Sequence, residues 1–153
     1  MATEISNSND IIGSRDLIEM IEDMESERGD LEEAVEDAED AIPVMDVVPQ
    51  ELLAPLVKAK QELADWDENN GEELKNLKAF AAEFENYCDD WNHGVTMIRE
   101  SYFTEYAEEL VKDIGDLPKD IPSYLVIDWD ATAENLKVDY AEGEFDGVTY
   151  YAR

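Results

Sequence analysis

Basic residues are scarce in this chain. Its 153 residues include 11 Lys and Arg against 41 Asp and Glu, which gives a formal net charge of −30. Proteins that bind DNA or RNA directly need Lys and Arg against the phosphates, and an anionic membrane surface would repel a chain of this charge. We therefore expect no direct nucleic-acid partner and no membrane partner. A basic protein surface is the partner that such a charge would attract.

Cysteine and histidine are nearly absent. Cys88 is the only cysteine, so no internal disulfide can form and a reducing compartment is expected. His93 is the only histidine, and its neighbours DDWNHG are typical of an exposed loop. The sequence also lacks a phosphate-binding loop, a dinucleotide-binding glycine pattern, a zinc-ligand spacing and a serine-hydrolase motif. We predict that the protein is not an enzyme and has no catalytic residues, cofactor or metal site.

Long apolar runs are also missing. No run approaches the roughly 20 residues that a membrane-spanning helix needs. The first ten residues, MATEISNSND, contain neither the basic nor the apolar region of a signal peptide. We therefore expect a cytoplasmic protein.

Apolar residues are nevertheless abundant enough for a folded chain. They make up 44% of the sequence and include three Trp, seven Tyr and four Phe, whereas a disordered acidic chain contains few aromatics. Core packing is the expected role of most of these aromatics, with a homodimer interface as the role of some. The net charge is −13 for residues 1–43, −8 for residues 44–97 and −9 for residues 98–153, so the acidity is not confined to a tail. Self-repulsion of this size costs stability, which indicates that the charge has a use.

Hydrophobic periodicity predicts an α+β protein that is mostly α-helical and elongated. After a frayed lead-in (1–13), helices are expected from Ser14 to Gly29, over 30–42, after Pro49 with Pro55 in or near the first turn, over about 72–87 and over about 102–114. The segments 65–71 and 88–94 are expected to be a turn and a loop. We divide the chain into an acidic helical N-terminal region, residues 1–66, and a C-terminal region, residues 67–153.

The C-terminal region has a different character. Residues 95–98 are expected to form a short strand, and Gly115 fits the position after a helix. Asp128 can cap a short helix, DWDATAENL. The Asp146-Gly147 pair, flanked by apolar and aromatic residues, predicts a β-hairpin, which gives a small C-terminal α/β element.

The most acidic stretch is residues 30–40, DLEEAVEDAED, where seven of eleven residues are carboxylates. Acids at i, i+3 and i+4 on a helix lie about 5–6 Å apart, a spacing close to that of DNA phosphates. B-DNA carries one charge per roughly 1.7 Å, so thirty charges correspond to about 15 base pairs. One alternative is a highly soluble protein, such as a halophilic one, whose charge serves only solubility. Another is a calcium site at DWDENNG, but this segment lacks the Gly and Glu of an EF-hand loop at the required positions. We predict a DNA-mimicking surface made of the carboxylates of Glu25, Glu27, Asp30, Glu32, Glu33, Glu36, Asp37, Glu39, Asp40, Glu72, Glu73, Glu105, Glu108, Glu109 and Asp113.

Residues 102–140, together with the terminal residues 144–151, contain a further pattern. An amphipathic helix that ends near Gly115 is followed by a proline-containing element, a short helix and the terminal EFDGVTYY. This region resembles the closing part of ArdA-type antirestriction proteins, and the match extends over roughly residues 70–153. The matching residues are Ile121, Pro122, Leu125, Ile127, Asp128, Trp129, Ala133 and Leu136.

The resemblance implies a DNA mimic that occupies the DNA-binding groove of type I restriction–modification enzymes, as an elongated homodimer without catalytic residues or cofactors. Proteins of this family are encoded by phages and mobile elements, which implies the host bacterial cytoplasm as the location. The aromatic and Gly-rich N-terminal domain of the family is not visible here, and acidic helices stand in its place. A CRISPR-Cas nuclease is therefore an alternative target. An acidic adaptor or chaperone for a basic protein and a cation-binding buffer are alternative functions.

Overall fold

A computed structural model describes residues 4–153 and has a mostly α-helical α+β fold, as predicted. The elements are β1 (Ile11–Gly13), α1 (Ser14–Asp40), α2 (Gln50–Glu85), β2 (Thr96–Arg99), α3 (Glu100–Asp113), α4 (Trp129–Lys137), β3 (Ala141–Phe145) and β4 (Val148–Ala152). The chain divides into two compact units, which we call unit 1 (the residues up to Ile18 and Ala79–Arg153) and unit 2 (Glu19–Lys78). The boundary predicted between residues 66 and 67 lies inside α2, and so within unit 2.

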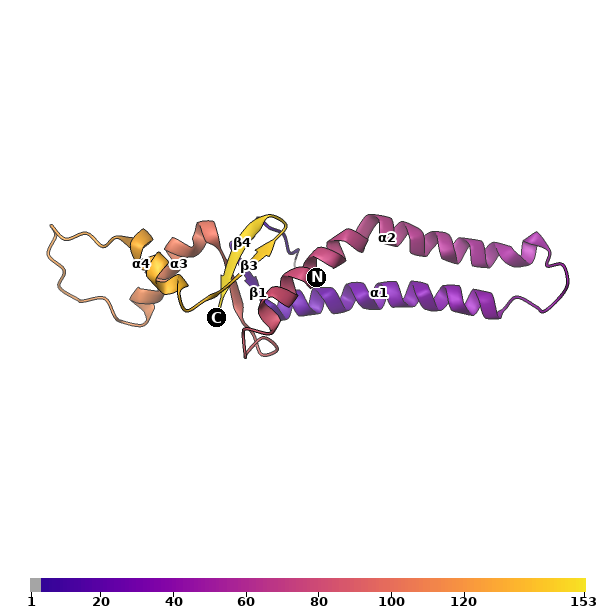
Figure 1. Cartoon of the computed structure of the whole chain (residues 1–153), viewed down its shortest axis with the longest axis horizontal. Helices are drawn as coiled ribbons and strands as arrows, with labels where there is room; N and C mark the ends of the chain where they lie inside the picture. Colours follow the sequence, from indigo (N-terminus) through magenta and orange to yellow (C-terminus); the bar gives the residue numbers. More distant parts are fainter. Residues whose placement is uncertain (1–3) are drawn as a thin grey trace. The chain divides into compact units, whose positions relative to one another are not determined.

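Unit 2 is a hairpin of two antiparallel helical segments, residues 19–40 of α1 and 50–78 of α2, joined by the loop 41–49 (Figure 1). One set of the less exposed residues of α1 recurs at alternating intervals of four and three, the spacing by which coiled-coil helices keep one seam against a partner. The members of this set are Leu17, Ile21, Met24, Arg28, Leu31, Val35 and Ala38. On α2 the matching seam contains Leu53, Leu56, Ala59, Leu63, Trp66, Leu74 and Leu77.

Two breaks predicted in this hairpin are wrong. Gly29 neither ends nor divides a helix, and residues 65–71 are helical instead of forming a turn. A glycine inside a helix costs only about 1 kcal/mol relative to alanine, and the seam of α1 continues past Gly29 without interruption. Likewise Trp66 is buried in the seam, so packing between the helices outweighs the local turn preference of DWDENNG. Pro55, which was expected in or near the first turn of its helix, is the sixth residue of α2 and so lies near that turn.

Unit 1 contains a four-stranded antiparallel sheet in the order β1-β2-β4-β3. Ile98 of β2 lies between Ile11 of β1 and Tyr151 of β4. Strand β1 corrects the prediction that residues 1–13 form a frayed lead-in, because Ile5 and Ile12 are buried and residues 11–13 pair with β2. The part of that prediction covering residues 1–3 lies outside the described residues.

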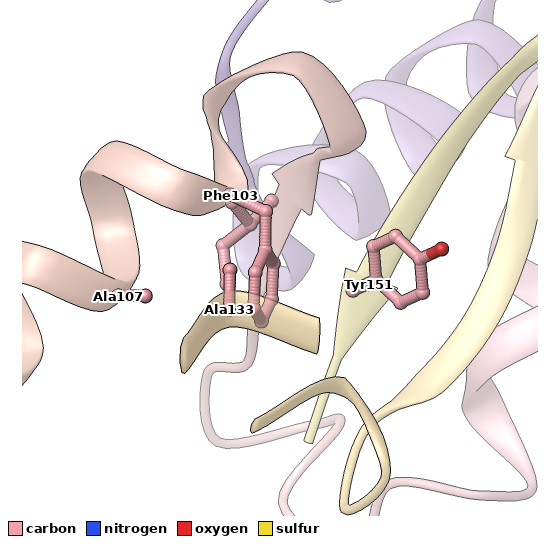
Figure 2. Packing of buried hydrophobic residues seen from close by; sticks show 5 residues of the cluster. Phe103, Ala107, Ala133 and Tyr151 are labelled. Carbon is pink, nitrogen blue, oxygen red and sulfur yellow. The ribbon is translucent and has the colours of Figure 1, made fainter. Parts of the chain in front are cut away.

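The core of unit 1 is built largely from aromatic side chains. The ring of Phe80 stacks on that of Phe145 with centroids 4.7 Å apart and meets Tyr150 edge-on at 5.3 Å. Figure 2 shows a second cluster, in which Phe103 of α3 lies close to Ala133 of α4 and Tyr151 of β4. The prediction that most aromatics serve the core is confirmed for the eight that are buried, namely Trp66, Phe80, Phe84, Trp91, Phe103, Phe145, Tyr150 and Tyr151.

Local signals place the remaining elements of unit 1 as predicted. The Asp128 carboxylate accepts a hydrogen bond of 3.0 Å from the Ala131 N–H and caps α4. Gly115 follows α3 with a φ of +76°, a conformation that glycine adopts without strain. Asp146 and Gly147 both have positive φ between β3 and β4, as a tight hairpin turn requires.

Candidate functional site

The residues of α1 that belong to unit 2 form a dense row of carboxylates. Residues 19–40 contain twelve acids and one base, Arg28, for a net charge of −11. At 1.5 Å per residue the segment is about 33 Å long and carries one net charge per about 3 Å. One strand of B-DNA carries one phosphate charge per about 3.4 Å of helix axis. In charge per unit length this part of α1 therefore matches a single DNA strand.

The structure places the predicted site residues on three helices. Nine lie on α1, two on α2 and four on α3. All of them are exposed except Glu108, which is half-buried on α3. Eleven of the fifteen are thus brought together on unit 2, and the other four form a separate group on unit 1.

Three of the five basic residues of unit 2 connect its two helices. The Arg28 guanidinium donates two hydrogen bonds to the Asp67 carboxylate, of 2.8 and 3.2 Å, and also pairs with Glu32. Two lysines of α2 reach across to α1 in the same way. Lys78 Nζ lies 2.8 Å from Glu25 Oε1, and Lys60 Nζ lies 3.8 Å from Glu39 Oε1. These positive charges are therefore engaged within the hairpin.

Most of the candidate carboxylates consequently keep an uncompensated charge. Four of the fifteen form ion pairs: Glu25, Glu32 and Glu39 with the residues named above, and Glu108 with Lys112. Within residues 4–153 the other eleven form no ion pair: Glu27, Asp30, Glu33, Glu36, Asp37, Asp40, Glu72, Glu73, Glu105, Glu109 and Asp113. We call the eight of these that lie on α1 and α2 the acidic row.

Helix stability does not explain this arrangement. The last turn of α1 contains no basic residue, and Asp37, Glu39 and Asp40 occupy the end of the helix where the backbone dipole disfavours negative charge. Like charges four residues apart, such as Glu33 and Asp37, each cost about 0.2–0.5 kcal/mol. The carboxylates of α1 therefore oppose folding locally, which favours a role in binding.

One residue at the centre of the hairpin was not anticipated from the sequence. Asp67 was predicted to lie in a turn, but its hydrogen bonds with Arg28 hold the pKa of the Asp67 carboxyl below its ordinary value. The same contacts raise the pKa of the Arg28 guanidinium. An arginine at a position that continues the apolar seam was the signal that an acidic partner faces it on the other helix.

The acidic group of unit 1 surrounds a tyrosine. The carboxylate of Glu109 raises the pKa of Tyr102, with smaller contributions from burial, Glu105 and Asp10. The nearby cation Lys137 is already engaged, because its Nζ lies 2.8 Å from Glu134 and over the rings of Phe103 and Tyr151. The α3 carboxylates therefore form a second, smaller negative surface.

Cys88, His93 and the carboxylates are the side chains whose placement bears on metal binding and nucleophilic chemistry. No cluster of three or more His, Cys, Asp or Glu side chains in residues 4–153 could hold a metal ion. Cys88 is buried, and that burial, together with the charge of Asp89, raises the pKa of its thiol, which disfavours the reactive thiolate. His93 is exposed in the loop after α2. None of the described helices combines the length and apolar character that crossing a bilayer requires.

The chain was also compared with known proteins. No protein-family model, curated protein or solved structure gives a significant match. The resemblance of residues 70–153 to ArdA-type proteins therefore stays a prediction, and the arguments below depend on the charges and contacts of this chain.

Proposed function

We propose that this protein is a DNA mimic that inhibits a bacterial DNA-targeting defence enzyme, with a type I restriction–modification enzyme as the first target and a CRISPR-Cas nuclease as the alternative. One observation carries the proposal. Over about 33 Å, α1 presents one net negative charge per about 3 Å, close to the phosphate spacing of one DNA strand. A groove that holds DNA presents Lys and Arg to the phosphates, so it would attract a helix with this density of carboxylates.

The way in which the cations of unit 2 are paired supports the same function. Arg28, Lys60 and Lys78 are occupied by contacts between α1 and α2, so they do not offset the acidic row toward a partner. When a basic groove meets this row, cations held around the carboxylates are released, as cations are released from DNA when a protein neutralises its phosphates. Association would then be fast at low salt and would weaken steeply as salt rises.

Inhibition of this kind requires only occupancy. No bond is made or broken, and no catalytic residue or cofactor takes part. The α3 carboxylates around Tyr102 would extend the negative surface on unit 1. A homodimer, as the ArdA resemblance implies, would present two copies of each surface in the cytoplasm of a host bacterium.

A cleavage assay with a purified type I restriction enzyme tests the proposal. The protein is titrated against the enzyme at two concentrations of duplex DNA that differ tenfold. Because mimic and DNA would compete for one groove, the concentration of protein that halves cleavage should rise about tenfold in the regime where DNA saturates the enzyme. Inhibition that does not change with DNA concentration would refute groove occupancy and indicate an adaptor or allosteric role. Inhibition of a Cas nuclease alone would move the target to the alternative.

A further inference from the structure

The loop that joins the two helices of unit 2 has an unusual composition. Residues 41–49, AIPVMDVVP, contain six apolar residues, two prolines and a single charge, Asp46. They follow directly on residues 30–40, where seven of eleven residues are acidic. Loop tips are ordinarily polar, because nothing in the fold covers their side chains. The change from acid to apolar residues at this point therefore requires an explanation.

Four of the six apolar side chains of the loop are exposed, and only Ile42 and Val48 are half-buried. Val44 is fully exposed and Val47 is 83% exposed, while Met45 is about half exposed. The exposed apolar surface continues into the first turns of α2, where Leu52 and Val57 are also exposed. A groove adjoins it on α2, lined by residues that include Leu53, Ala54 and Val57. We call the exposed surface made of Val44, Met45, Val47, Leu52 and Val57 the apolar tip.

The charge around the apolar tip restricts what can cover it. Unit 2 carries 20 acids and five bases, a net charge of −15. A second copy would bring another −15 to the same place, and an anionic membrane would repel the neighbouring carboxylates. A protein surface with an apolar pocket and basic side chains around it satisfies both the tip and the acidic row beside it. The prolines Pro43 and Pro49 restrict the loop, which lowers the entropy lost when it docks.

We propose that the apolar tip is a second contact site, which inserts into an apolar pocket bordered by basic side chains on the protein partner. This inference deepens the proposed function, on which the identity of that partner rests. DNA has no counterpart to such a tip. The tip would therefore give the inhibitor a contact that DNA cannot make, and one that weakens little with salt because it depends on apolar burial.

The test uses two synthetic peptides, so it does not depend on the identity of the enzyme. One is a helical peptide of Leu and Lys with the leucines on one face, and the other is an oligolysine with the same number of lysines. Binding is measured by fluorescence anisotropy of the labelled peptides. We expect the protein to bind the Leu/Lys peptide at least about tenfold more tightly than oligolysine. The variant Val44→Ser/Val47→Ser should lose most of this preference while its affinity for oligolysine stays unchanged.

The matched control is Val126→Ser/Val138→Ser in unit 1. Both of these valines are as exposed as the two in the loop, at 91% and 83%, so neither double substitution should disturb the fold. The control should bind both peptides as the unaltered protein does. With a type I enzyme, the tip variant should weaken inhibition about tenfold at every salt concentration, leaving the salt dependence itself unchanged.

Specific outcomes would overturn the inference. One is equal binding of the two peptides by the unaltered protein, and another is an unchanged preference in the tip variant. Sedimentation that shows a dimer for the unaltered protein and a monomer for the tip variant would assign the tip to a second copy. Tip-dependent binding to neutral phosphatidylcholine vesicles would assign it to a lipid surface. Failure of the DNA competition assay alone would refute mimicry and leave the peptide result to decide the role of the tip.

Discussion

The two units carry the same net charge on very different frameworks. Unit 1 has 21 acids and six bases and unit 2 has 20 and five, so each has a net charge of −15, but unit 2 has only 60 residues. Eighteen apolar residues are buried in the described part of unit 1, compared with four in unit 2: Ala59, Trp66, Leu74 and Leu77. Acid density is thus highest where the core is thinnest. A hairpin of long helices offers much surface for little core, which suits a unit whose role is to present charge.

The ion pairs differ between the units in the same sense. In unit 1 the pairs Lys112–Glu108 and Lys137–Glu134 each lie within one helix and do not connect elements. Unit 2 also has pairs within one helix, Arg28–Glu32 and Lys58–Glu62, but in addition Arg28, Lys60 and Lys78 each pair with the opposite helix. Unit 1 is therefore held together by its aromatic core, whereas unit 2 depends on a narrow apolar seam and on charge pairs. Changes in charge should affect unit 2 more than unit 1.

The largest expected effect concerns binding. Neutralising three unpaired carboxylates of α1 together, Glu33→Gln/Glu36→Gln/Asp37→Asn, should weaken inhibition by about 2 kcal/mol, roughly 30-fold, because each exposed charge is worth up to about 1 kcal/mol. Each single change should have an effect of less than about fivefold. The measurement is the inhibition constant in the cleavage assay at fixed DNA and salt.

The matched control for this comparison is on α3. Neutralising Glu105, Glu109 and Asp113 removes the same number of unpaired charges from unit 1. If α1 is the principal contact, this triple variant should retain more inhibition than the α1 triple variant. Equal losses would show that both units face the partner equally. One substitution that abolishes inhibition in a folded protein would indicate a specific site and contradict a distributed charge surface.

An effect of intermediate size is expected on stability when a glycine of each unit is replaced by alanine. A Cβ atom at Gly143 in β3 would lie 2.6 Å from the buried ring of Phe84, so Gly143→Ala should destabilise the protein by about 1–3 kcal/mol. A Cβ atom at Gly29 would meet nothing within 4 Å. Gly29→Ala should therefore stabilise α1 by about 0.5–1 kcal/mol, the usual gain inside a helix. Urea unfolding followed by circular dichroism measures both changes, and destabilisation by Gly29→Ala would show that α1 needs the glycine.

The smallest expected effect is the pH dependence of the Arg28–Asp67 pair. The pKa of Asp67 is lowered in the folded protein by its hydrogen bonds with Arg28, so the folded state binds fewer protons there than the unfolded state. The stabilisation is fully present above about pH 4 and is lost as pH falls through the lowered pKa. The difference in Tm between the unaltered protein and Arg28→Gln should therefore shrink as pH is lowered from about 5 to about 2. A difference that stays constant over this range would contradict a role for this ion pair.

The same contrast explains which elements could be predicted. In unit 1, local chemistry decides the structure: Asp128 caps α4, Gly115 follows α3, and Asp146-Gly147 forms the hairpin turn. In unit 2, the packing of α1 against α2 overrides the local signals at Gly29 and at residues 65–71. Strand β1 was missed because three residues, Ile11–Gly13, are too few to show a period, and they acquire partners only from β2.

The candidate site was predictable as a set of acids but not in its details. Composition and spacing indicate which residues are charged and that they lie on exposed helical faces. They do not indicate which charges are compensated, since that depends on how the two helices pair. Glu25 and Glu27 look alike in the sequence, yet only Glu25 meets Lys78. The exposure of Val44 and Val47 likewise depends on how the helices pair, because neither helix covers these two side chains of the loop.

The pairing of Arg28 with Asp67 also determines how far α1 can slide along α2. Lys60 lies seven residues before Asp67 and Leu74 lies seven residues after it. A slip of one heptad would therefore place Arg28 against another cation or against an apolar side chain. Such a slip would move the α1 carboxylates of the acidic row by about 10 Å relative to α2. An arginine within the apolar seam thereby excludes the neighbouring alignments, although a leucine there would permit them. The distance between the carboxylates of α1 and the valines of the loop is consequently the same in every folded copy, as recognition by a rigid partner would require.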